Sequence, residues 1–225
     1  MQTNQHLGGE QVQALASVRY DLRNAVGLSA ALGPQQAEKN LWFGTHLAAT
    51  QAGDVVVCDR AYAEYSVMAT LVARQCHFVI RFPRPSFTAV NVFWAAPAQE
   101  CVVTREVTSK ARAYVAQPQL PTTLRVRLIK VVLTSGEVEV LGTDLLAAQT
   151  YPAAEFKAVY GWRWQHETYH ARIKNIFEVE RFSGKSVQAI TQDFYGVIFL
   201  ATVESILSKP AQAELTAQGE ARECR

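Results

Sequence analysis

Apolar and polar residues alternate loosely along residues 16–32, with a polar break near residues 24–27. This spacing is typical of half-buried strands, so we predict two strands joined by a tight turn. Gly33 and Pro34 interrupt the pattern, and proline is well tolerated at the start of a helix. Residues 35–50 are therefore predicted to be helical.

Strands and helices then follow one another. Residues 55–59 form a β-branched apolar run that ends in Asp59, which predicts a buried strand with a carboxylate at its C-terminal end. A helix is predicted over residues 65–75 and a short strand over residues 77–81. Ligand sites in open α/β sheets lie beyond the carboxyl ends of strands. Asp59 is therefore a candidate functional residue, and a capping role is the alternative.

The second half of the chain has longer patterned segments. Residues 87–107 and 124–143 alternate with period two, and Ser135-Gly136 inside the second run is a hairpin turn signal. Residues 153–179 are predicted to be helical, and residues 186–207 to form a helix pair or one long helix. This order of elements predicts a mixed α/β architecture.

Composition agrees with a globular chain that has no membrane span. The 225 residues are 49% hydrophobic and 19% charged, enough for one domain with a core and an insertion. The apolar run at residues 194–207 contains Glu204 and is too short to cross a bilayer, so it is predicted to be a buried helix. The start is polar, which argues against a signal peptide. Four scattered cysteines indicate reduced thiols in a cytoplasm.

The net charge is only +2, but its distribution is uneven. Between residues 81 and 130 eight basic residues stand against two acids. The basic residues are Arg81, Arg84, Arg105, Lys110, Arg112, Arg125, Arg127 and Lys130. A locally basic segment suits a phosphodiester polymer, whose affinity comes largely from phosphate neutralisation. Ordinary solvated charge on exposed strands is the alternative.

Four chemically distinct residues near the end have helical spacing: Tyr160, Arg163, Glu167 and Lys174. On one α-helix their offsets place them on a stripe about 60° wide. The apolar residues of the segment fall on another arc that can face a core: Trp162, Tyr169, Ile173, Ile176 and Phe177. A carboxylate in a row with a phenol and two cations can hold a metal ion and a phosphate backbone. A solvated surface with an Arg–Glu pair is the alternative.

Together with the box Asp59-Arg60-Ala61-Tyr62, these four residues resemble a transposase of the insertion-sequence-four type. This is a DDE-type transposase with a Y-(2)-R-(3)-E-(6)-K signature, which the chain matches at every position. The resemblance covers roughly residues 16–207 and includes the segments 127–130, 141–145 and 180–186. The signature helix is a specific motif, whereas the Asp-Arg-x-Tyr box alone is weak.

The resemblance implies a ribonuclease H-like mixed sheet flanked by helices, with a β-rich insertion before the acidic helix. The implied core comprises residues 16–82 and 150–207, and the insertion residues 83–149. A polar leader at residues 1–15 and a polar tail at residues 208–225 flank it.

Two departures from the family pattern affect the expected activity. Ala61 stands where the family usually has glycine, a mild change at a turn. The family also needs three acidic residues, and no residue before Asp59 fits the first. Asp54 lies at the start of its strand, and Asp21 matches the second strand of the fold. We therefore expect a truncated, poorly active copy whose core lacks its first strand.

The resemblance also assigns roles to residues. Asp59 and Glu167 would bind Mg²⁺ or Mn²⁺ for two-metal phosphoryl transfer. DNA phosphates would be contacted by Tyr160, Arg163, Lys174 and Arg60. The implied partners are double-stranded DNA, as element ends and target, and a second copy in a homodimer. The implied location is the bacterial cytoplasm, at the nucleoid.

Two alternative functions and one further candidate site stay open. The chain can be a DNA-binding transposase remnant that does not cleave. His166 to His170 also satisfy the H-E-x-x-H pattern of zinc hydrolases, although no third ligand follows at a familiar distance. Trp94 can be a platform for a base turned out of the duplex, with ordinary packing as its default role.

Overall fold

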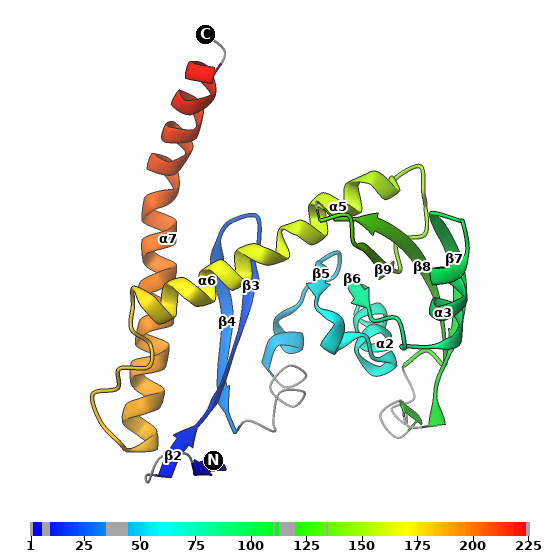
Figure 1. Ribbon diagram of the computed structural model, residues 1–225. Helices are drawn as coiled ribbons and strands as arrows, with labels where there is room; N and C mark the ends of the chain where they lie inside the picture. The colour runs from blue at the N-terminus through cyan, green and yellow to red at the C-terminus, as the bar shows by residue number, and fades with distance from the viewer. Residues whose placement is uncertain are drawn as a thin grey trace. The chain divides into compact units, whose positions relative to one another are not determined.

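The computed structural model describes residues 2–5, 10–34, 45–109, 111–112, 120–133 and 135–223. The chain folds as two compact units (Figure 1). The first unit comprises Met1–Ala49 and Trp164–Arg225, and the second comprises Thr50–Arg163. The domain boundaries predicted from the sequence stay a prediction.

A five-stranded mixed sheet forms the centre of the second unit. Its order is β5 (Val55–Cys58), β6 (His77–Phe82), β9 (Val138–Thr143), β8 (Thr123–Val132) and β7 (Glu100–Glu106). β5 and β6 are parallel, and the remaining neighbours are antiparallel. Helices α2 (Tyr65–Ala73), α3 (Thr88–Ala95) and α5 (Ala153–Gly161) belong to the same unit. The predicted mixed α/β class is thereby confirmed.

Helix α5 is attached to the sheet through a cluster of buried side chains. Phe156 and Tyr160 of α5 join Val79, Ile129 and Leu141 of three neighbouring strands. Each of these five side chains is at most 4% exposed. Burial of this apolar face fixes the helix on the strands and so fixes the place of Tyr160.

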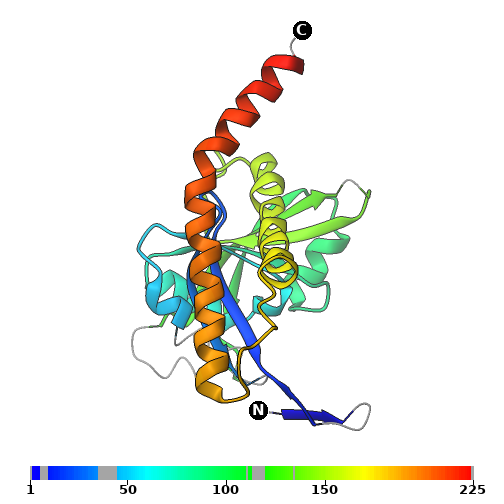
Figure 2. The same ribbon diagram turned by 90° about the vertical axis from the view of Figure 1, so that its left-hand side faces the viewer.

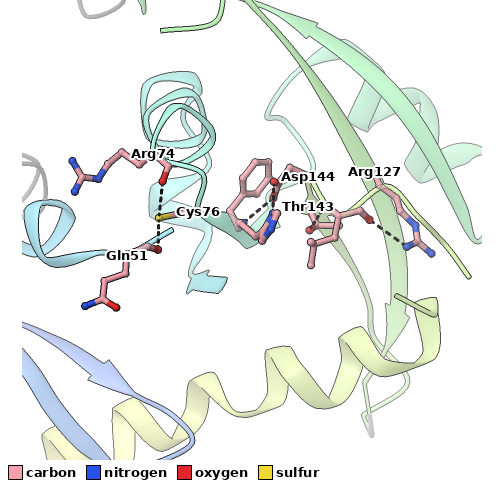
Figure 3. Close-up of polar contacts among 9 residues, drawn as sticks. Gln51, Arg74, Cys76, Arg127, Thr143 and Asp144 are labelled. Carbon is pink, nitrogen blue, oxygen red and sulfur yellow. Dashed lines mark hydrogen bonds and ion pairs between the residues drawn. The ribbon is translucent and has the colours of Figure 1, made fainter. Parts of the chain in front are cut away.

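Polar contacts fix the beginning of β6 (Figure 3). Asp144, directly after β9, accepts a hydrogen bond from the Phe78 backbone N–H at 2.9 Å and contacts His77 Nδ1 at 2.8 Å. The Cys76 thiol lies 3.1 Å from the Gln51 carbonyl oxygen, to which it donates. These contacts hold the start of the strand whose other end carries Arg81.

Two elements differ from the sequence prediction. Residues 88–95, predicted as part of an alternating strand, form α3 because Val90 and Phe93 lie one turn apart and are both buried. The helix predicted over residues 153–179 is divided at Trp162 into α5 and α6 (Arg163–Asn175). The β8–β9 hairpin is confirmed, and its Gly136 has φ +85°, in the region that favours glycine.

The first unit contains the predicted strand pair. β3 (Leu15–Asp21) and β4 (Val26–Gly33) are antiparallel and joined by a tight turn. A second antiparallel pair, β1 (Gln2–Gln5) and β2 (Glu10–Gln13), lies within the predicted polar leader. Much of the helix predicted over residues 35–50 lies outside the described residues, and Leu47–Ala49 form a short 3₁₀ turn.

Helices α6 and α7 (Val187–Glu223) cover the β3–β4 hairpin. The shared core contains Val18 of β3, Tyr169 and Ile173 of α6, and Phe194 and Ile198 of α7. Figures 1 and 2 show α7 as one long continuous helix, one of the two predicted forms. It extends beyond residue 207, into the predicted polar tail.

α7 is buried along one face rather than all round, which corrects the prediction of a buried helix. Phe199, Leu200 and Leu207 are 66%, 56% and 74% exposed. Among the described residues, the stretch Val187–Ala211 is long and apolar enough to span a membrane by length and composition alone. Helices of soluble proteins also pass this test, and Phe194 and Ile198 pack in the core of the first unit.

Candidate active site

Asp59 lies at the carboxyl end of the parallel pair β5–β6. The pairing of Cys58 with Ile80 brings the two strand ends side by side, so the next residues, Asp59 and Arg81, are neighbours. The Arg81 Nε atom is 3.3 Å from Asp59 Oδ1, and the Asp59 side chain is 39% exposed. The half-exposed carboxylate at this position is accessible to a ligand, and its role as a metal ligand stays a prediction.

Arg81 bridges two carboxylates. Its guanidinium also forms an ion pair and hydrogen bond with Glu139 of β9, whose side chain is 9% exposed. Burial lowers the pKa of Arg81, but the hydrogen bond to Glu139 and the electrostatic interactions with Tyr160, Glu139 and Asp59 raise it, and the net shift is upward. A permanently charged arginine therefore holds the Asp59 carboxylate in place.

Tyr160 reaches the same carboxylate from α5. Its hydroxyl donates a long hydrogen bond of 3.4 Å to Asp59 Oδ1, and its ring belongs to the core of the second unit. Burial raises the pKa of Tyr160 to about 12, against the opposing effect of Arg163. The phenol thus stays neutral and donates. The Arg163 guanidinium carbon lies 5.5 Å from the centre of the Tyr160 ring.

The structure thus brings together three of the predicted site residues: Asp59, Tyr160 and Arg163. Arg60 is exposed in the 3₁₀ turn that follows Asp59. The predicted single helix for the four signature residues is corrected, because Tyr160 lies in α5, which ends at Gly161, while Arg163 begins α6.

Glu167 and Lys174 belong to the first unit, on the exposed surface of α6. Lys174 Nζ lies 3.0 Å from Glu180 Oε1, and both side chains are more than half exposed. Such an exposed pair contributes little to stability. The meeting of Asp59 with Glu167 around one metal ion stays a prediction.

Sequence reasoning missed Arg81 and Glu139. Arg81 closes a predicted strand, but only the parallel pairing of β5 and β6 makes it a neighbour of Asp59. Glu139 was visible as an acid inside an apolar strand. A buried carboxylate needs a cationic partner, so this acid is a signal that could have drawn attention to the site.

The two earlier aspartates serve local turns. Asp21 accepts hydrogen bonds from the backbone N–H groups of Arg23 and Asn24 at 2.9 and 3.0 Å. Asp54 accepts one from the Gln51 N–H at 3.0 Å. Both contacts are typical of turn caps.

Much of the basic segment is engaged inside the second unit, which corrects the picture of a basic surface. Arg127 is 2% exposed and forms an ion pair with Glu100. Arg105 lies over the Phe87 ring at 4.6 Å, and Lys130 lies over the Phe93 ring at 4.9 Å. Exposed positions in this segment include Arg112 and Arg125, while Lys110 lies outside the described residues.

The structure also bears on Trp94 and on the metal sites suggested by the sequence. Trp94 is partly buried, and the Arg84 guanidinium carbon lies 5.7 Å from the centre of its ring. The Arg84 guanidinium therefore covers one face of the Trp94 ring, and a stacked base would need a free face. In the described part of the chain, no group of three or more His, Cys, Asp or Glu side chains is placed to hold a metal ion.

Comparison with known families decides the identity of the domain. The family model described as transposase DDE domain matches residues 4–203. The chain belongs to this family. No curated protein matches the chain.

For a DDE transposase domain, DNA is the substrate, and the family typically uses divalent metal ions. Asp59 fits such a role here: it offers a half-exposed carboxylate oxygen, the ligand type that Mg²⁺ and Mn²⁺ prefer. Arg81 and Tyr160 already orient this carboxylate.

Proposed function

We propose that this transposase domain cleaves and transfers DNA strands in a metal-dependent reaction, as a member of the insertion-sequence-four group with a ribonuclease H-like core. One observation carries the proposal. Tyr160 of the signature contacts Asp59 of the Asp-Arg-x-Tyr box, about a hundred residues earlier at the carboxyl end of β5, and Arg163 lies over the Tyr160 ring.

Asp59 and Glu167 would hold the metal ion, Mg²⁺ or Mn²⁺. The bound metal supplies activation of the attacking oxygen and charge neutralisation at the leaving oxygen. Arg81 orients Asp59 through an ion pair, and the Tyr160 hydroxyl donates a hydrogen bond to the same carboxylate. Arg163, Lys174 and Arg60 would bind backbone phosphates of element ends and target, Arg163 as a fork and Lys174 as a point charge.

The sequence supplies two of the three expected acidic residues. A metal held by fewer carboxylates is bound more weakly, so we infer that the chain is a poorly active copy. Pairing of two DNA ends would involve a homodimer, at the nucleoid.

Incubation of the chain with duplex DNA carrying the element ends tests the proposal. We expect slow nicking with Mg²⁺ or Mn²⁺, and none with a chelator. Asp59→Asn and Glu167→Gln should reduce nicking to background, because each removes a charged metal ligand. Glu155→Gln is the matched control, since Glu155 is an exposed acid in the first turn of α5 and has no role in the proposed site.

Duplex binding that weakens with salt but brings no cleavage would favour the non-catalytic remnant instead. Cleavage that survives Asp59→Asn would overturn the proposed site.

A further inference from the structure

Two histidines of α6 face each other one helical turn apart. The Nε2 atoms of His166 and His170 are 3.2 Å apart, with ring centroids at 4.3 Å and an interplanar angle of 79°. Both side chains are partly buried in the first unit. This cluster takes no part in the proposed DNA chemistry, which uses oxygen ligands and basic side chains.

A third atom with a lone pair lies beside the two imidazoles. The backbone carbonyl oxygen of Val18, in β3, is 3.0 Å from His166 Nε2. The His166 Nε2 atom therefore contacts a carbonyl oxygen and, when His170 carries its hydrogen on Nδ1, an imidazole lone pair. A neutral imidazole has a single N–H, so one hydrogen is shared between these two acceptors or serves one of them.

We propose that His166 and His170 bind one first-row transition metal ion, such as Ni²⁺, Cu²⁺ or Zn²⁺, through the Nε2 lone pairs of two neutral imidazoles, each of which carries its hydrogen on Nδ1. Imidazole nitrogen suits these ions, and two histidines at i and i+4 on a helix form a common bidentate pair. Tetrahedral Zn–N bonds of about 2.05 Å place two ligand nitrogens roughly 3.3 Å apart. The separation of 3.2 Å between the two Nε2 atoms matches this geometry.

The Val18 carbonyl oxygen is the third metal ligand, and water completes the coordination. The ion would then connect α6 to β3 and stabilise the first unit, because it binds the folded arrangement and not the unfolded chain. The site requires no role for Glu167, so it is a binding site and not the zinc hydrolase that the H-E-x-x-H pattern suggested.

Nickel titration of the full chain, with excess Mg²⁺ present to saturate carboxylate sites, tests the proposal. Calorimetry should show one Ni²⁺ per chain, and Ni²⁺ should raise the midpoint of thermal unfolding. His170→Gln should lose both effects, because the amide does not replace imidazole as a metal ligand. Glutamine is chosen because its amide oxygen can still accept a hydrogen bond from His166. His166→Gln should lose them as well.

His77→Gln is the matched control, because His77 is a half-exposed histidine of the second unit held by Asp144. It should bind Ni²⁺ like the wild type. Circular dichroism in metal-free buffer confirms that each variant is folded. Equal Ni²⁺ affinity in His170→Gln and the wild type, or no binding to the wild type, would overturn the proposal.

The result is independent of the proposed DNA cleavage. Asp59→Asn and Glu167→Gln should retain Ni²⁺ binding while they lose Mg²⁺-dependent nicking. His170→Gln should show the reverse pattern. Failure of one proposal therefore leaves the other testable.

Discussion

Arg81 lies between two carboxylates of unequal exposure, Asp59 at 39% and Glu139 at 9%. Removal of the guanidinium would leave Glu139 buried without its cation. A buried charge that loses its partner is strongly destabilising, whereas loss of an exposed pair costs little. The pair with Glu139 thus matters for stability, and the contact with Asp59 matters for the site.

Arg81→Gln is expected to lower the free energy of unfolding by about 2 kcal/mol at neutral pH, because Glu139 loses its charged partner. Urea unfolding measures the change. Arg125→Gln removes an exposed arginine of β8 and should leave stability within about 0.5 kcal/mol of the wild type.

Adding Glu139→Gln to Arg81→Gln should recover part of the loss, since no buried charge then remains. A double variant less stable than Arg81→Gln would show that Glu139 has another essential partner.

At this scale the sequence could predict the positions of Asp59 after a strand and of Tyr160 in a helix, because both are local patterns. It could not predict Arg81 and Glu139 as their partners. Their proximity depends on the parallel pairing of β5 with β6 and the antiparallel pairing of β6 with β9, which are contacts between distant segments.

In strand β9, Gly142 packs tightly against the ring of Phe82. A Cβ atom at Gly142 would lie 2.0 Å from Cε2 and 2.6 Å from Cδ2 of Phe82, on the adjacent strand β6. The Phe82 ring is 1% exposed and packs against Phe87 with centroids 5.5 Å apart, so it has little room to move.

Gly142→Ala is therefore expected to destabilise the chain by about 3 kcal/mol through overpacking. Gly161→Ala is the control, because nothing lies within 4 Å of a Cβ atom there. Both are compared by thermal unfolding. An unchanged midpoint for Gly142→Ala would mean that Phe82 can leave its place at no cost.

Hydrophobic periodicity alone does not predict the type and the bounds of every helix and strand. The alternation of residues 87–107 is compatible with a strand, yet Val90 and Phe93 favour a helix over residues 88–95 once both are buried. The division of the signature segment at Trp162 could not be predicted from the sequence pattern either, because Trp162 keeps helical backbone angles and is 43% exposed.

At the scale of the whole molecule, the family and the mixed α/β class follow from the sequence, and the match over residues 4–203 confirms the DDE transposase domain. The division into two compact units does not follow from it. The signature segment crosses that division, because Arg163 is the last residue of the second unit and Trp164 belongs to the first.

Mn²⁺ binding to the wild type, Asp59→Asn, Glu167→Gln and the double variant, measured by calorimetry, tests the central claim most directly. If both carboxylates bind one shared ion, either single substitution removes most of the affinity. The double variant is then little worse than either, so the effects are far from additive. Independent, additive effects, or full affinity in either single variant, would contradict the shared metal site.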